Sequence, residues 1–323
     1  MRAIVRDEYT PTADALRLRE LPVPVPGAGQ VLVRVHAASF GQDVWHVMAG
    51  LPLLARPAFG LPRPKQPVLG GDLAGIVEAV GDGVAGFAIG DRVLGRGDGT
   101  FADYAIARAE LLAVLPDAVD WVTAAALPVS GSTALNAVRA GRVREGRRVL
   151  VIGAAGGVGH LIVQLAVDAG AVVTGVCRPE ADDFVRSLGA VRTLDYGFAD
   201  RPADADGRYD IILDTGGRRK LRLLRRHLAS DGTIVVVGGE GGGSVLGGFQ
   251  RSIFAPLAAI GSKQRMVGLV STDSGPVLAE LAALVASGRI RPRVHATLPL
   301  ERAADGMRMM RAGGVRGKIA LEL

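Results

Sequence analysis

The sequence predicts an α/β protein of two domains, one of which contains a doubly wound parallel sheet. The chain has 323 residues, which is too long for one ordinary hydrophobic core. Roughly the first 120 residues show the alternating and glycine-interrupted patterns of short strands. Residues 147–237 alternate apolar strand segments with helical patterns, and this alternation is typical of a parallel sheet.

Strand signals dominate the N-terminal part. Residues 30–37 alternate apolar and polar side chains, which predicts a half-buried strand. Residues 68–92 are apolar and interrupted by glycines, as expected for short strands joined by tight turns. Residues 51–67 contain five prolines and are expected to form an irregular loop.

The pattern changes to alternating helices and strands after Trp121. A helical stretch at 123–140 is interrupted around 128–131, and a glycine-rich loop is expected at 238–248. The predicted strands are 149–153, 171–176, 211–213 and 234–237, and the helices between them are 158–169, 181–188 and 218–228. The remainder is expected to form a helix at 277–287, a strand at 294–298, a helix at 301–311 and a strand at 318–323.

Composition narrows the class of protein. Hydrophobic residues make up 49% and charged residues 22%, as in globular domains. No apolar run reaches the ~18 residues of a membrane span. The N-terminus has acidic residues where a signal peptide needs an apolar core, so a cytoplasmic protein is expected. The net charge of +6 comes from scattered arginines, so no nucleic-acid partner is expected.

A glycine-rich segment between a strand and a helix carries the functional prediction. Residues 147–159 read RRVLVIGAAGGVG, with Ala154, Gly156 and Gly159 in the three positions of a dinucleotide-binding fingerprint. Small residues let a diphosphate approach backbone amides, and the helix N-terminus adds partial positive charge. A tight turn without a ligand is the alternative interpretation.

The end of the second strand indicates which nucleotide is bound. An NAD site usually has an acidic residue here for the ribose 2′-hydroxyl, but this chain has Cys177 and Arg178. Arg178 would attract a 2′-phosphate, which favours NADPH over NADH. The alternative is that Arg178 is a solvated loop residue. Cys177, the single cysteine, is expected to be a small buried residue and not a reactive thiol.

With these motifs in place, the chain resembles the zinc-independent medium-chain dehydrogenases/reductases of the quinone oxidoreductase (zeta-crystallin-like) family. The similarity covers essentially the whole length; the matching stretches are 70–95, 126–139, 188–196, 209–217 and 317–321, together with the glycine loop and the residues Gln164 to Ala166. The resemblance implies a GroES-like β-barrel substrate domain formed by residues 1–122 and 264–323. It also implies a Rossmann domain at 123–263, bound NADPH and a homodimer.

The resemblance also suggests individual site residues. Thr133 matches a position near the nicotinamide, and Tyr196 matches one that contacts the 2′-phosphate; Gly238 and Gly239 follow the last Rossmann strand, where backbone approaches the nicotinamide. For these the alternatives are a helix hydroxyl bonded to its own backbone, a strand-end aromatic and an ordinary turn. The full expected cofactor set is Thr133, Ala154, Ala155, Gly156, Gly157, Val158, Gly159, Cys177, Arg178, Tyr196, Thr215, Gly238 and Gly239.

The substrate end departs from the family. Zinc-dependent relatives have a catalytic cysteine and a Gly-His-Glu motif at positions that match Gly41 and Gly70-Gly71-Asp72 here, so no metal site is expected. Without a Lewis acid, the expected substrates are quinones and α,β-unsaturated carbonyls, small molecules that accept hydride readily. A usual asparagine is Gly41, and a tyrosine of some bacterial members is His46.

These departures leave several interpretations open. His46 is a candidate proton donor, although such a histidine is more often a packed or surface residue. A tailoring enoyl reductase acting on acyl or polyketide-like substrates is an alternative function, because the 51–67 loop could shape such a pocket. A binding-only protein, crystallin-like or RNA-binding, is a second alternative, because position 41 has lost its polar group.

Overall fold

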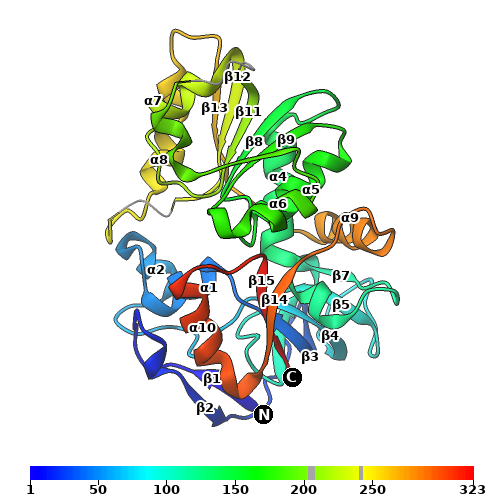
Figure 1. Cartoon of the computed structure of the whole chain (residues 1–323). Helices are drawn as coiled ribbons and strands as arrows, with labels where there is room; N and C mark the ends of the chain where they lie inside the picture. Colours follow the sequence, from blue (N-terminus) through cyan, green and yellow to red (C-terminus); the bar gives the residue numbers. More distant parts are fainter. Residues whose placement is uncertain (203–207, 240–242) are drawn as a thin grey trace. The chain divides into compact units, whose positions relative to one another are not determined.

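The computed structural model describes residues 1–202, 208–239 and 243–323. The chain forms two compact units, one from Met1–Ser132 with Asp273–Leu323 and the other from Thr133–Thr272 (Figure 1). The boundaries therefore lie later than the expected 122/123 and 263/264. The second boundary moves because β13 (Arg265–Gly268) pairs with β12 (Leu228–Val236) and so belongs to the parallel sheet.

The first unit is built around a seven-stranded sheet. Five of its six neighbouring strand pairs are antiparallel, and β14 and β15 pair in parallel. The sheet order is β14 (Val294–Pro299), β15 (Lys318–Glu322), β3 (Gln30–Ser39), β4 (Asp72–Val80), β5 (Arg92–Arg96) and β7 (Leu112–Val114), with β6 (Tyr104–Arg108) on β3. The other elements are the two-stranded sheet of β1 (Arg2–Val5) and β2 (Arg17–Glu20) and the helices α1 (Gln42–Ala49), α2 (Arg56–Phe59), α3 (Trp121–Ala125), α9 (Gly275–Ala286) and α10 (Ala303–Ala312).

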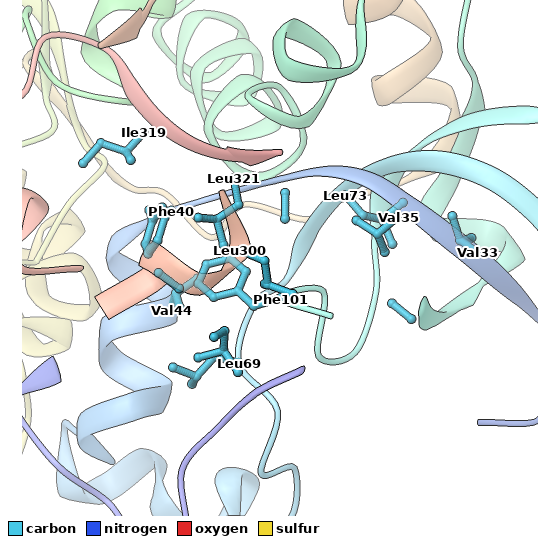
Figure 2. Close-up of a cluster of buried hydrophobic side chains, with 14 of the residues drawn as sticks. Val33, Val35, Phe40, Val44, Leu69, Leu73, Phe101, Leu300, Ile319 and Leu321 are labelled. Atoms are coloured by element: carbon cyan, nitrogen blue, oxygen red, sulfur yellow. The ribbon is translucent and has the colours of Figure 1, made fainter. Parts of the chain in front are cut away.

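Alternation along β3 gives the first unit its core. Val31, Val33 and Val35 point to one side and are buried, as the period of the sequence predicted. The rings of Phe40 and Phe101 meet with their centroids 4.7 Å apart, and Leu300 packs into the same cluster (Figure 2). Segments from both ends of the chain therefore share one hydrophobic core.

The second unit contains a six-stranded parallel sheet. Its order is β10 (Arg192–Leu194), β9 (Val172–Val176), β8 (Arg148–Ile152), β11 (Tyr209–Asp214), β12 and β13. Figure 1 shows α5 (Gly159–Asp168) and α6 (Asp182–Ser187) on one side of this sheet and α7 (Leu221–Leu224) and α8 (Phe249–Phe254) on the other. The strand order reverses between β8 and β11, which is where doubly wound sheets bind ligands. Helix α4 (Pro128–Gly141) begins before the boundary between the units and continues past it.

Some local predictions are corrected. The helix expected at 218–228 is only α7 and a short 3₁₀ turn, because β12 begins at Leu228. The prolyl segment 51–67 contains α2, which has a proline at its N-terminus. Strand β12 lies between β11 and β13 in the sheet. The expected loop 238–248 lies partly outside the described residues, at 240–242. Among the helices of the described ranges, none is long and apolar enough to cross a membrane.

Candidate functional site

The glycine loop connects β8 to α5 at the carboxyl edge of the parallel sheet. Gly153 turns the chain out of β8 with φ of +80°, a conformation that suits glycine. A Cβ at Gly153 would lie 2.4 Å from the hydroxyl oxygen of Thr215, which itself donates to the Ile152 carbonyl at 2.7 Å. Thr215 therefore lies beside the start of the loop.

Some backbone amides of the loop are bonded within the protein and others are open. Those of Gly153 and Ala154 both donate to the Val176 carbonyl at 3.0 Å and hold the loop against β9, and that of Gly156 donates to the Gly153 carbonyl at 3.0 Å. The amides of Ala155, Gly157 and Val158 donate no hydrogen bond to any residue that the structure describes. They lie just before α5, whose N-terminus favours anions, so the loop offers open donors to a phosphate group.

The fingerprint glycines have different steric roles. A Cβ at Gly159 would lie 2.0 Å from the Gly153 carbonyl oxygen, so glycine is required there for the loop to close on the helix. A Cβ at Gly156 would meet only that oxygen, at 3.4 Å, so the protein leaves space on this side. The space at Gly156 is therefore available to a ligand, which fits a bound diphosphate.

A cavity of about 210 Å³ adjoins the end of β9. It is lined by Cys177, Arg178, Pro179, Asp182, Thr193, Leu194 and Asp195. Its carboxylates are already paired: Asp182 with Arg186 at 2.8 Å and Asp195 with Arg201 at 2.6 Å. The side chain of exposed Arg178 makes no hydrogen bond or ion pair among the described residues, so its charge is available to a ligand.

Cys177 is buried, and burial raises the pKa of its thiol. A raised pKa disfavours the thiolate, which agrees with a structural residue and not a reactive one. Its backbone amide donates to the Leu194 carbonyl at 3.0 Å and joins the ends of β9 and β10.

A second arginine comes close to the predicted phosphate contacts. Burial raises the pKa of the Tyr196 phenol, while the charges of Arg178 and Arg218 act to lower it, so both guanidinium groups lie within electrostatic range of the ring. Arg219 donates to the Tyr196 carbonyl. Arg218 was not among the expected site residues; the signal for it is its position directly after the YDIILDTGG stretch.

The remaining expected cofactor residues lie in the second unit. A Cβ at Gly238 would lie 2.0 Å from the Thr215 carbonyl oxygen, which places the turn after β12 against Thr215. Gly239 lies beside Gly248, since its Cβ would lie 3.2 Å from the Gly248 carbonyl carbon. Thr133 lies in α4, and its hydroxyl makes no hydrogen bond within the described part of the chain, including none to its own helix backbone.

Comparison with known proteins identifies the family. The pattern described as alcohol dehydrogenase GroES-like domain matches residues 27–117, and the one described as zinc-binding dehydrogenase matches residues 188–321. A chloroplast envelope quinone oxidoreductase homolog of Arabidopsis thaliana is 31% identical across 100% of this chain and 98% of its own length. The chain belongs to the quinone oxidoreductase group of the medium-chain dehydrogenases/reductases.

Solved structures and further relatives agree with this assignment. The quinone oxidoreductase of Coxiella burnetii superimposes with a TM-score of 0.84 at 26% identity, covering 100% of this chain and 99% of that one. The family fold is thus confirmed, and the family uses a nicotinamide cofactor. The pikromycin polyketide synthase component PikAII of Streptomyces venezuelae is 31% identical across 94% of this chain, which matches 8% of that protein.

The two glycines that the resemblance matches to metal-ligand positions lie in the first unit. Gly41 is the N-cap of α1, and Gly71 immediately precedes β4. Neither residue has a side chain that can bind a metal. Across the described residues, no three His, Cys, Asp or Glu side chains come together in a way that could hold a metal ion.

His46 lies in the last turn of α1. Its Nδ1 is 3.0 Å from the Leu51 carbonyl oxygen, and its ring packs edge-on against Trp45 with the centroids 5.1 Å apart. These contacts account for a structural role. The role of His46 as a proton donor stays a prediction.

Proposed function

We propose that this protein is an NADPH-dependent reductase that transfers hydride to a quinone or α,β-unsaturated carbonyl without a catalytic zinc. The observation that carries the proposal is the combination of open loop amides with an unpaired Arg178 at the end of β9. The amides suit the diphosphate, and the arginine suits an additional phosphate on the ribose. The cofactor supplies the hydride, and the protein supplies binding, orientation and a protected pocket.

Two features of the charged groups near the end of β9 support NADPH over NADH. Arg178 and Arg218 bring two positive charges to Tyr196, and the cavity carboxylates are neutralised by their own arginines. A ribose 2′-hydroxyl would find no unpaired carboxylate among the cavity residues. A 2′-phosphate would find at least one unpaired guanidinium.

Titration of Arg178→Ala with both nucleotides tests the cofactor proposal. The affinity for NADPH should fall by roughly 1–3 kcal/mol, the value of a hydrogen bond to a charged group, and the affinity for NADH should stay unchanged. Arg222→Ala is the matched control, because Arg222 is an exposed arginine of α7 in the same unit. Equal NADPH and NADH affinities in the unmodified protein would contradict the proposed role of Arg178.

The substrate proposal rests on Gly41 and Gly71. With glycine at both positions that correspond to metal-ligand residues, alcohol oxidation lacks its usual Lewis acid, whereas conjugated acceptors remain reducible. NADPH oxidation followed at about 340 nm with naphthoquinones and 2-alkenals should show turnover that a chelator does not reduce. Loss of activity with the chelator, and its return with zinc, would disprove zinc independence.

An enoyl reductase of acyl or polyketide-like substrates is the second candidate. The match to a polyketide synthase component over 94% of this chain favours it. Enoyl thioesters in the same panel separate the two functions by their relative kcat/KM. Tight NADPH binding without turnover of any acceptor would instead support the binding-only alternative.

Size-exclusion chromatography with light scattering would test the proposed homodimer. Fractionation of cells would test the proposed cytoplasmic location.

A further inference from the structure

Five charged side chains gather in the first unit and have no role in the proposed cofactor site. We call them the charge cluster; they are Asp43, Asp72, Arg96, Asp273 and Lys318. Asp72 and Lys318 form its buried side, with Nζ 3.3 Å from the carboxylate and both side chains only 2% exposed. Arg96 lies at the more exposed side, at the end of β5.

Arg96 is held by carboxylates from three elements. Its Nη1 lies 3.1 Å from Asp43 at the start of α1 and 3.5 Å from Asp72 at the start of β4. Its Nε lies 3.9 Å from Asp273, just before α9. Burial lowers the pKa of Arg96, but these carboxylates outweigh burial and raise the pKa above its ordinary value. The guanidinium is therefore charged and fixed in orientation.

Two glycines adjoin the charge cluster. A Cβ at Gly71 would lie 2.9 Å from Nη2 of Arg96, so a side chain at position 71 would collide with the guanidinium. A Cβ at Gly41 would lie nearest to the Asp43 carboxylate, with Nζ of Lys318 at 3.8 Å. These are the two positions that correspond to metal-ligand residues in zinc-dependent relatives. In this chain, a fixed organic cation lies where a side chain at position 71 would project.

The remaining nitrogen of Arg96 is open. Nη2 makes no hydrogen bond among the described residues, and 26% of the Arg96 side chain is exposed. Nη1 donates to Asp43 at 3.1 Å, whereas both N–H groups of Nη2 remain available to donate in the plane of the guanidinium. That geometry suits an oxygen atom that carries or acquires negative charge.

We propose that Arg96 is the group that binds the carbonyl oxygen of the acceptor and stabilises the charge that develops on it. This inference rests on the proposed reductase function and names its electrophilic residue. As hydride and its electron pair bond to the β-carbon of an enone, the carbon–carbon π pair shifts and the carbonyl oxygen becomes an enolate oxygen. Arg96 donates hydrogen bonds to that oxygen and keeps its protons, and a solvent proton completes the saturated ketone or aldehyde.

Steady-state kinetics of Arg96→Gln test the proposal. Removal of a donor to a developing oxyanion should lower kcat by about 10²-fold or more, while the dissociation constant of NADPH stays unchanged. Arg96→Lys keeps the charge without the planar fork and should recover part of kcat. Arg34→Gln is the matched control, because Arg34 forms an exposed ion pair with Glu78 at 2.6 Å in the same sheet, and its kcat should not change.

Two measurements distinguish a direct contact between Arg96 and the substrate from a purely structural role of Arg96. Benzoate, whose carboxylate resembles the charged oxygen, should inhibit competitively against the acceptor and bind at least about tenfold more weakly to Arg96→Gln. Methylguanidinium should restore turnover to Arg96→Ala, as expected only if the missing group acts on the substrate. Should Arg96→Gln not fold, Gly71→Ala displaces Nη2 and keeps the charge, and it should lower kcat in the same way.

A folded Arg96→Gln or Gly71→Ala protein with kcat within twofold of the unmodified protein would overturn the proposal. Failure of the proposed function looks different: the unmodified protein would bind NADPH and reduce no conjugated carbonyl. In that case, benzoate binding that depends on Arg96 would still support an oxyanion site, and its absence would count against one.

Discussion

At the scale of single residues, Asp273 links the charge cluster to the pH dependence of the protein's stability. Its side chain is 23% exposed, and burial raises its pKa, although the charge of Arg96 acts in the opposite direction. The cluster contains three carboxylates and two cations, so it has one negative charge in excess when all five groups are ionised. Asp273 lies farthest from Arg96 of the three carboxylates.

Asp273→Asn should therefore change the pH dependence of stability. Below the ordinary aspartate pKa, the carboxyl is protonated in both the folded and unfolded chains. As pH rises through the raised folded pKa, the unfolded chain ionises first, so this group's contribution to stability is lost. The Tm of Asp273→Asn minus that of the unmodified protein should grow by roughly 1–3 °C as the pH rises from about 3.5, just below the ordinary aspartate pKa, to about 7. A difference that is constant with pH would show that Asp273 is not perturbed.

Residue identity alone predicted the buried Cys177 and made Arg178 a candidate phosphate contact, because each depends on its own strand end. It did not predict Arg218 or Arg96, whose partners come from distant parts of the sequence. Arg96 meets Asp43, Asp72 and Asp273, and only the folded sheet brings these carboxylates together. A local pattern contains no signal for such a set.

At the scale of elements, two glycines of the loop between β8 and α5 are expected to have different roles. Gly156 should affect ligand binding, and Gly159 should affect folding. Gly156→Ala adds a methyl group to open space, so stability should change by less than ~0.5 kcal/mol. The same methyl occupies the expected diphosphate position and should weaken NADPH and NADH equally, by about tenfold or ~1.4 kcal/mol. Fluorescence titration and thermal unfolding check the two effects.

Gly159→Ala, in the same loop, is expected to lower the stability of the protein, unlike Gly156→Ala. Its Cβ would lie 2.0 Å from the Gly153 carbonyl oxygen, and backbone cannot move aside as a flexible side chain can. The free energy of unfolding should fall by roughly 1–3 kcal/mol. If Gly156→Ala proved the less stable of the two, the steric roles assigned to these glycines would be wrong.

Most strands and long helices followed from the sequence. The period of β3, the apolar runs of β8 and β9 and the pattern of α9 are strong local signals. The short α7 was overestimated because leucines at helical spacing continue into β12, where pairing with β11 decides the outcome. Strand β13 was missed because its four residues are too few to show a period.

At the scale of the whole molecule, the Lys318–Asp72 pair joins distant ends of the chain inside the first unit. Lys318 Nζ also donates to the Ser130 hydroxyl at 3.1 Å, and Ser39 donates to Asp72 at 3.0 Å, so the buried charges are well satisfied. Removing one partner leaves the other charge buried, which is more costly than an exposed ion pair.

Lys318→Met should lower the free energy of unfolding by about 3–5 kcal/mol. Arg34→Met, which breaks an exposed pair in the same sheet, should cost at most about 1 kcal/mol. The double variant Asp72→Asn with Lys318→Met should recover part of the loss, because no buried charge is left uncompensated. Chemical denaturation of the four proteins checks this order, and equal losses for Lys318→Met and Arg34→Met would contradict it.

The position of β15 between β14 and β3 has a consequence for biosynthesis. Strand β3 is translated within the first 39 residues, but its partner β15 begins only at Lys318. The 140 residues of Thr133–Thr272 leave the ribosome before that partner exists. The nascent chain can therefore complete its parallel sheet while one edge of β3 is still unpaired. If translation stops before β15 is made, the product keeps an exposed strand edge, which makes it prone to aggregation and a substrate for chaperones and proteases.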